Sequence, residues 1–141
     1  MSLLLNPFIM LDGSAKEAIE FYEKSLGAKV LFKQTFGEGP QNPNFPLSAD
    51  EKDRIAHSVL KIGESEMMVS DLMPGQTHQI GSLVNICISV NDTEQAKQIY
   101  EALRQNGQVN IPLAAVHFSP AYGMVTDQYG VTFQIFTKRP S

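Results

Sequence analysis

The sequence predicts an α+β fold of two tandem β-α-β-β-β modules, because one pattern occurs twice. In each half a strand-like run leads through a short turn into a run with apolar residues at i, i+3, i+4 and i+7, typical of a helix. These helical runs begin at Ala15 and Ala96, roughly 80 residues apart. We therefore expect a first module over 1–75 and a second over 76–141. Their sheets should curve together into a cleft, where a ligand would bind.

The first module is expected to run strand, helix, strand and hairpin. Ser14, with Glu17 three residues later, has the pattern of a capping box at the helix start. Gly27 suits a left-handed residue at the helix end. The expected strands are 5–11, 29–36, 57–62 and 66–70.

Residues 37–54 interrupt this module with a stretch rich in Gly, Pro and Asn. It has too few apolar residues for a core element, and an irregular stretch of this length is usually a lid, a binding loop or a mobile excursion. The charged residues 50–54 are expected to form a solvated turn or a short helix. A linker over 71–81 then leads to the second module.

The second module repeats the order, with a helix from Thr93 to about Asn106 and an irregular loop through Ser119 and Pro120. The hairpins of the two modules align, so that Met68 corresponds to Gln134. The expected strands are 85–90, 108–113, 122–126 and 131–136.

Alternation along the strands separates two faces of each sheet. The apolar set should lie under the helices: Pro7, Ile9, Leu11, Leu60, Ile62, Ile86, Ile88 and Val90. The opposite set should face the cleft: Asn6, Phe8, Met10, His57, Val59, Asn85, Cys87 and Ser89. Polar groups on such a face are typical of a pocket lining.

Bulk composition excludes several classes of function. A net charge of −4 with scattered Lys and Arg argues against a nucleic-acid partner, which needs a basic stripe. No apolar run reaches the length of a membrane span, so no membrane partner is expected. Cys87 is the single cysteine and cannot form an internal disulfide. We expect a cytoplasmic protein.

His57 is the best candidate for acid–base or ligand-orienting chemistry, although no paired carboxylate is evident; the alternative is a histidine hydrogen-bonded at a strand start. Asn85 and Gln134 could hold a ligand carbonyl or hydroxyl, or could satisfy each other. Cys87 is expected to be a small buried hydrophobe, and His78 and His117 to be solvated. An apolar ligand-binding lining, or alternatively plain core, is expected from Phe8, Met10, Met68, Phe118, Tyr122 and Phe136.

The segments 6–22, 57–63 and 127–134 resemble the vicinal oxygen chelate superfamily, which includes glyoxalase I, extradiol dioxygenases and the fosfomycin and bleomycin resistance proteins. The closer resemblance is to its PhnB-like branch, and it covers nearly the whole chain except the loop at 37–54. The resemblance implies the glyoxalase/dioxygenase-like fold. It also supports a homodimer, with modules paired within a chain or across the dimer.

Metal enzymes of this superfamily place ligands on the first and last strand of each module. The resemblance carries those positions to Asn6, Met68, Asn85 and Gln134. None is a His or a carboxylate, and neutral amides with a thioether match Mg, Mn or Fe(II) poorly. We therefore expect no metal and no cofactor. Some proteins of this branch are labelled ubiquinone-precursor methyltransferases, but no Gly-rich strand–helix turn supports that activity here.

Three functions follow from these expectations. The first is metal-free binding of an unidentified small, partly apolar molecule. The second is a divalent-metal-dependent lyase, dioxygenase or transferase of the glyoxalase type, with His57 as a true ligand. The third is a non-catalytic interaction domain whose cleft is filled by its own side chains. Whether any reaction is catalysed is left open.

Overall fold

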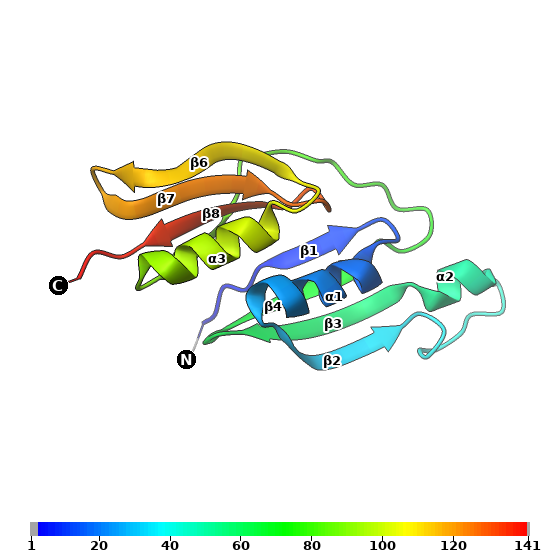
Figure 1. Ribbon diagram of the computed structural model, residues 1–141. Coiled ribbons are helices and arrows are strands. Elements are labelled where there is room, and N and C mark those ends of the chain that lie inside the picture. The colour runs from blue at the N-terminus through cyan, green and yellow to red at the C-terminus, as the bar shows by residue number, and fades with distance from the viewer. Residues whose placement is uncertain (1–2, 141) are drawn as a thin grey trace. The chain divides into compact units, whose positions relative to one another are not determined.

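The computed structural model describes residues 3–140, and these residues fall into two compact units divided between Gln79 and Ile80. Each unit has the expected β-α-β-β-β order, with one short extra helix before the third strand of the first unit, so the α+β prediction is confirmed (Figure 1). The first unit contains β1 (Phe8–Leu11), α1 (Ala15–Leu26), β2 (Lys29–Thr35), α2 (Ala49–Asp53), β3 (Ile55–Ile62) and β4 (Ser65–Asp71). The second contains β5 (Ile86–Val90), α3 (Thr93–Leu103), β6 (Gln108–Val116), β7 (Ser119–Thr126) and β8 (Thr132–Thr137).

Each unit has one four-stranded sheet, and the two sheets share one topology. The strand orders are β1-β4-β3-β2 and β5-β8-β7-β6. The strand before the helix pairs in parallel with the last strand, and the other neighbours are antiparallel. Met68 and Gln134 take the same register position in the two sheets, which confirms the sequence alignment of the hairpins.

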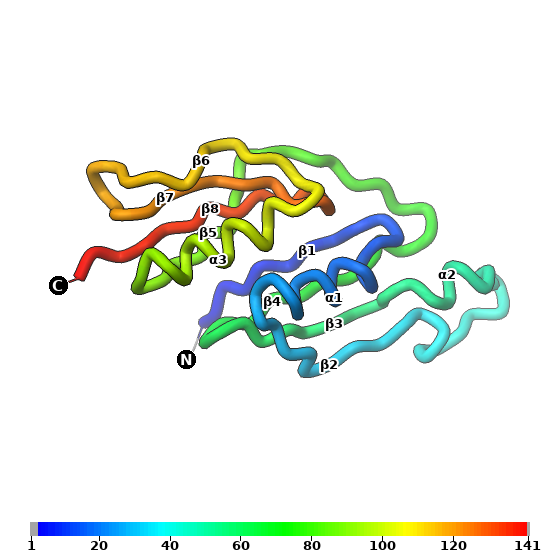
Figure 2. Tube along the Cα trace, in the orientation of Figure 1, coloured from blue at the N-terminus to red at the C-terminus, as the bar shows by residue number. Residues whose placement is uncertain are grey.

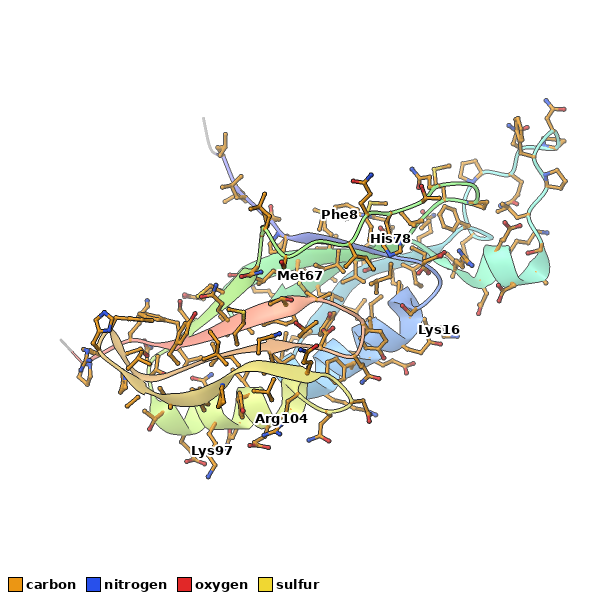
Figure 3. All side chains as sticks on the ribbon, turned by 90° about the horizontal axis from the view of Figure 1, so that it is seen from above. Phe8, Lys16, Met67, His78, Lys97 and Arg104 are labelled. Atoms are coloured by element: carbon orange, nitrogen blue, oxygen red, sulfur yellow. The ribbon has the colours of Figure 1, made fainter. Side chains whose placement is uncertain are left out.

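One helix covers one face of each sheet. Helix α1 packs on β3 and β4, and α3 packs on β5, β7 and β8 (Figure 1). The buried positions of α1 include Ile19 and Tyr22, at 1% and 0% exposure, as the helical spacing predicts. Burying a side chain such as Ile19 contributes about 1.5–3 kcal/mol. The outer side of α3 is charged, and Lys97 extends from it away from the sheet (Figure 3).

Gly27 ends α1 as expected. Its φ of 66° is left-handed, a conformation that costs little only for glycine. The next N–H, of Ala28, donates to the Tyr22 carbonyl at 3.2 Å. The start of the helix differs from the prediction, because Ser14 makes no side-chain capping bond.

Several element boundaries differ from the sequence expectation. Helix α3 ends at Leu103, and Ser119 and Pro120 begin β7 instead of lying in an irregular loop. The connection over residues 72–85, between β4 and β5, contains no helix or strand (Figure 2). No helix among residues 3–140 is long and apolar enough to cross a membrane.

Candidate functional site

The face of the first sheet opposite α1 is a mostly apolar surface, which we call the first open face. A row across all four strands is formed by register partners: Phe8, Met68, Val59 and Phe32. Phe8, labelled in Figure 3, is 48% exposed and Phe32 46%, so the row is not buried in the unit's core. Met10, 42% exposed, extends the face along β1.

His57 lies on this face with aromatic neighbours. Its ring centroid is 5.8 Å from that of Phe8 and 6.0 Å from that of Phe32. The strand order places β3, which carries His57, between β1 and β2. This setting is suited to stacking against a planar group. It does not supply the carboxylate partner that general acid–base catalysis by a histidine usually needs.

The sequence reasoning did not place Phe32 on this face. Simple alternation would put Phe32 on the same side as Val30. The register shifts between these two residues, so Val30 pairs with Leu60 of the helix side and Phe32 with Val59 of the open face. A β-bulge of this kind resets the alternation of side chains between the two faces. In the sequence, the adjacent apolar residues Leu31 and Phe32 are the only, weak sign of it.

The second open face is the corresponding surface of the second sheet. Its equivalent row contains Cys87, Gln134, Met124 and Ile111. An aromatic cluster lies on the neighbouring row, where Phe136 pairs with Tyr122. The duplicated topology therefore presents an apolar row in one unit and a partly polar row in the other.

A chain of polar side chains crosses this second open face. The Tyr122 hydroxyl donates to Gln134 Oε1 at 2.8 Å, and Gln134 Nε2 donates to Asn85 Oδ1 at 3.1 Å. Asn85 Nδ2 in turn donates to the Ser82 carbonyl at 3.3 Å. All three side chains are half-buried. The structure thus joins Asn85 to Gln134, which is one of the two alternatives expected for this pair, and adds Tyr122, which the sequence analysis had placed in the apolar lining.

Aromatic rings border this polar chain. Phe118 is 5.0 Å from Tyr122 between ring centroids, and it stacks on Phe136 at 6.2 Å with an interplanar angle of 11°. Phe118 is 45% exposed. Polar groups beside exposed aromatic surface are typical of sites for small organic molecules.

The residues at the four metal positions that the resemblance implies do not fit a divalent cation. Asn85 and Gln134 already bond each other through an amide N–H and an amide oxygen, and Met68 offers only a soft thioether. Asn6 donates its Nδ2 to the Glu66 carbonyl at 3.3 Å. Within residues 3–140 no group of three or more His, Cys, Asp or Glu side chains could hold a metal.

The helix starts do not fit an anionic cofactor either. At the start of α1, the N–H groups of Gly13 and Ala15 donate to Asp71 Oδ1 at 2.8 and 3.1 Å. At the start of α3, the N–H of Gln95 donates to Asp92 Oδ1 at 2.7 Å. A helix start binds phosphate through free N–H groups, and here carboxylates of the chain accept from them.

Cys87 corrects one expectation. It was predicted to be a buried hydrophobe, but the structure places it exposed on the second open face, 3.9 Å from the Ser89 hydroxyl. Its strand is at the edge of the sheet, where alternation turns every second side chain away from the helix. His78 and His117 are exposed, as expected.

This duplicated fold recurs in solved structures of other proteins. The chain is similar to a glyoxylase/bleomycin resistance protein/dioxygenase domain from Frankia sp. EAN1pec, with a TM-score of 0.70 and 12% identity over 99% of each chain. It is also similar to protein PA1353 from Pseudomonas aeruginosa, with a TM-score of 0.87 and 28% identity over 99% of this chain and 100% of that one.

The chain belongs to the 3-demethylubiquinone-9 3-methyltransferase family, which matches residues 4–136. It is 30% identical to Protein YjdN of Escherichia coli, over 93% of this chain and 92% of that protein. A PhnB protein from Bacillus cereus, described as a putative 3-demethylubiquinone-9 3-methyltransferase, shares the fold with a TM-score of 0.78 and 20% identity, over 96% of this chain and 99% of that one. These matches establish a PhnB-like protein and no specific activity.

Proposed function

We propose that this protein binds a small, partly apolar organic molecule on the open faces of its sheets, without a metal ion. The observation that carries the proposal is the Asn85–Gln134 pair. These two positions correspond to metal-ligand positions of the superfamily, and here they hold neutral amides that are hydrogen-bonded to each other at 3.1 Å.

The composition of the two faces supports the chemical class of the ligand. Apolar and aromatic side chains on both faces can bury a hydrocarbon or aromatic body, which contributes about 25 cal/mol per Å² of apolar surface. The half-buried amides on the second face can hold one polar group of the same molecule. The expectation that both modules line one shared cleft stays a prediction.

Metal analysis combined with a thermal-shift screen tests this proposal. Protein purified without added metal should contain far less than one equivalent of Zn, Ni, Mn or Fe. Small aromatic acids and ketones should raise its melting temperature equally in EDTA and in divalent metal, because the ligand needs no cation. Stoichiometric bound metal, or stabilisation that disappears in EDTA, would instead favour a metal-dependent enzyme of the glyoxalase type.

We also propose that two chains associate into a homodimer. Each sheet has two edge strands, β1 and β2 in one unit and β5 and β6 in the other, and unpaired edges favour association. The exposed Leu31 and Phe32 on β2 add apolar surface at one of these edges. Light scattering after size exclusion should give twice the 15.6 kDa chain mass, whereas a monomer at micromolar concentration would refute the dimer.

A further inference from the structure

The hydrogen-bond chain from Tyr122 to Ser82 has only one possible direction. The Ser82 carbonyl can only accept, so the Asn85 atom facing it at 3.3 Å must be the Nδ2 donor. That choice turns Asn85 Oδ1 towards Gln134 and requires Gln134 to present its Nε2 there. Gln134 Oε1 then faces Tyr122, whose hydroxyl must donate.

This fixed direction decides what the face offers to a ligand. The hydroxyl hydrogen of Tyr122 is used within the chain, and each amide oxygen already accepts one bond. Among residues 3–140, Asn85 and Gln134 each retain one amide N–H outside this hydrogen-bond chain, because a primary amide has two. Each bond in such a hydrogen-bond chain polarises the next amide, which strengthens these remaining donors.

We infer that the second open face selects ligands that carry a hydrogen-bond acceptor, a planar carboxylate or carbonyl, next to an aromatic or apolar body. This inference rests on the proposed function and adds the polarity of the ligand. Free Asn and Gln side chains can flip to meet either donors or acceptors, but here the Ser82 carbonyl fixes Asn85, and Asn85 Oδ1 in turn fixes Gln134. The Tyr122 hydroxyl occupies Gln134 Oε1, which makes Tyr122 a positioning residue, and the apolar body of the ligand would lie against Phe118 and Phe136.

A matched pair of probes tests this selection on the full chain. Benzoate and benzamidine have nearly the same shape, but benzoate only accepts hydrogen bonds and protonated benzamidine only donates them. In an NMR titration of the side-chain amides in EDTA, benzoate should bind at least about 10-fold more tightly. It should also shift one N–H of Asn85 and one of Gln134 downfield. The net charge of −4 attracts the benzamidine cation and repels benzoate, so overall electrostatics cannot produce the expected preference for benzoate.

Two variants test whether the direction of the hydrogen-bond chain decides which probe binds more tightly. Gln134→Glu replaces the amide donor by an acceptor and should reverse the preference towards benzamidine. Tyr122→Phe frees Gln134 Oε1 to accept a hydrogen bond from a ligand. This variant should therefore bring the dissociation constants of benzoate and benzamidine closer together. The matched control is Tyr100→Phe, which removes a hydroxyl from the buried side of α3 and should leave the ratio unchanged.

Three outcomes separate this inference from the proposed function. Preference for benzoate, reversed in Gln134→Glu, supports both. Equal binding of the two probes, or tighter binding of benzamidine to the unmodified protein, overturns the acceptor selection and leaves the proposed function standing. Binding of neither probe, with no stabilising molecule in the thermal-shift screen, overturns the proposed function and this inference with it.

Discussion

Asp71, at the end of β4, connects three parts of the first unit through its buried carboxylate. Its Oδ1 accepts from the N–H groups of Gly13 and Ala15, and its Oδ2 accepts from the N–H of Ile55 at 2.9 Å. The residue is only 2% exposed. Carboxylates that accept several backbone N–H bonds in a buried site hold those segments in place strongly.

We predict that Asp71→Asn destabilises the protein by about 2–4 kcal/mol. Asparagine has one acceptor oxygen where aspartate has two, so its NH2 group would face either the Ile55 N–H or the N–H pair at the start of α1. Urea denaturation of both proteins measures the difference in the free energy of unfolding. A loss below about 0.5 kcal/mol would contradict this account of the site.

Thr137 provides a matched control at the same register position of the second unit, since it pairs with Val90 as Asp71 pairs with Leu11. Its Oγ1 is buried and has no hydrogen-bond partner among residues 3–140. Thr137→Val removes that unpaired hydroxyl while keeping the shape of the side chain. Its free energy of unfolding should stay within about 0.5 kcal/mol of the unmodified protein or rise above it.

Asp71 also shows where prediction from sequence stopped at the residue scale. The Ser14–Glu17 pattern predicted a local capping box, but the start of α1 is capped by a carboxylate 56 residues further along the chain from Ala15. A capping partner so distant has no fixed spacing to detect. The same holds for the hydrogen bonds of Asn85 and Gln134. The two residue types could be selected from the sequence, but the geometry of their bonds depends on how the strands pair.

At the scale of elements, the edge strands β2 and β6 show where the sequence pattern fails. Strand β6 runs to Val116, three residues beyond the predicted end, although it contains Pro112. Proline is tolerated on an edge strand because its missing N–H faces no partner. Register shifts in β2 and β6 then break the period-2 pattern on which strand and face predictions depend.

Local hydrogen bonds near Glu38 hold the segment after β2, and their contribution to stability depends on pH. The Thr35 N–H donates to Glu38 Oε1 at 2.9 Å, and this bond holds the pKa of the Glu38 carboxyl below its usual value. Because the pKa is lowered in the folded state, the contribution of this hydrogen bond to stability is fully present above the ordinary glutamate pKa. It is lost as the pH falls through the lower, folded value.

An NMR pH titration checks this expectation. The Glu38 carboxyl carbon should titrate below the model-peptide value for glutamate, and the Thr35 amide proton should move with the same midpoint. Glu38→Gln should abolish that transition at Thr35. A midpoint at or above the ordinary glutamate value would contradict the assigned hydrogen bond.

At the scale of the whole molecule, one topology is used twice with different surface chemistry. The row Phe8, Met68, Val59 and Phe32 corresponds in register to Cys87, Gln134, Met124 and Ile111. The repeat itself could be predicted, because the helix-facing positions keep their apolar spacing in both halves. The open faces are free of that packing requirement, so their chemistry differs between the units. Alternation assigned Phe8, Val59 and Cys87 to these faces, whereas the place of Phe32 and the register across the strands came from the structure.

The connection between the units should be the first internal site of proteolysis. Residues 72–85 form no helix or strand, and Leu83 and Val84 are 98% and 84% exposed. We expect brief chymotrypsin digestion to cut after Leu83, because a protease needs an extended, accessible chain. The exposed Phe45 precedes Pro46, which protects that bond. Mass spectrometry of early fragments checks this, and a first cut within β1–β4 or β5–β8 would contradict it.

The most direct test of metal-free binding is the dissociation constant of benzoate, measured calorimetrically in EDTA and again in excess Mn²⁺. The account predicts two values within about twofold of each other, because amides and a thioether give the cation no favourable ligand set. Benzoate that binds only in Mn²⁺, together with saturable Mn²⁺ binding that Asn85→Ala and Gln134→Ala abolish, would contradict it.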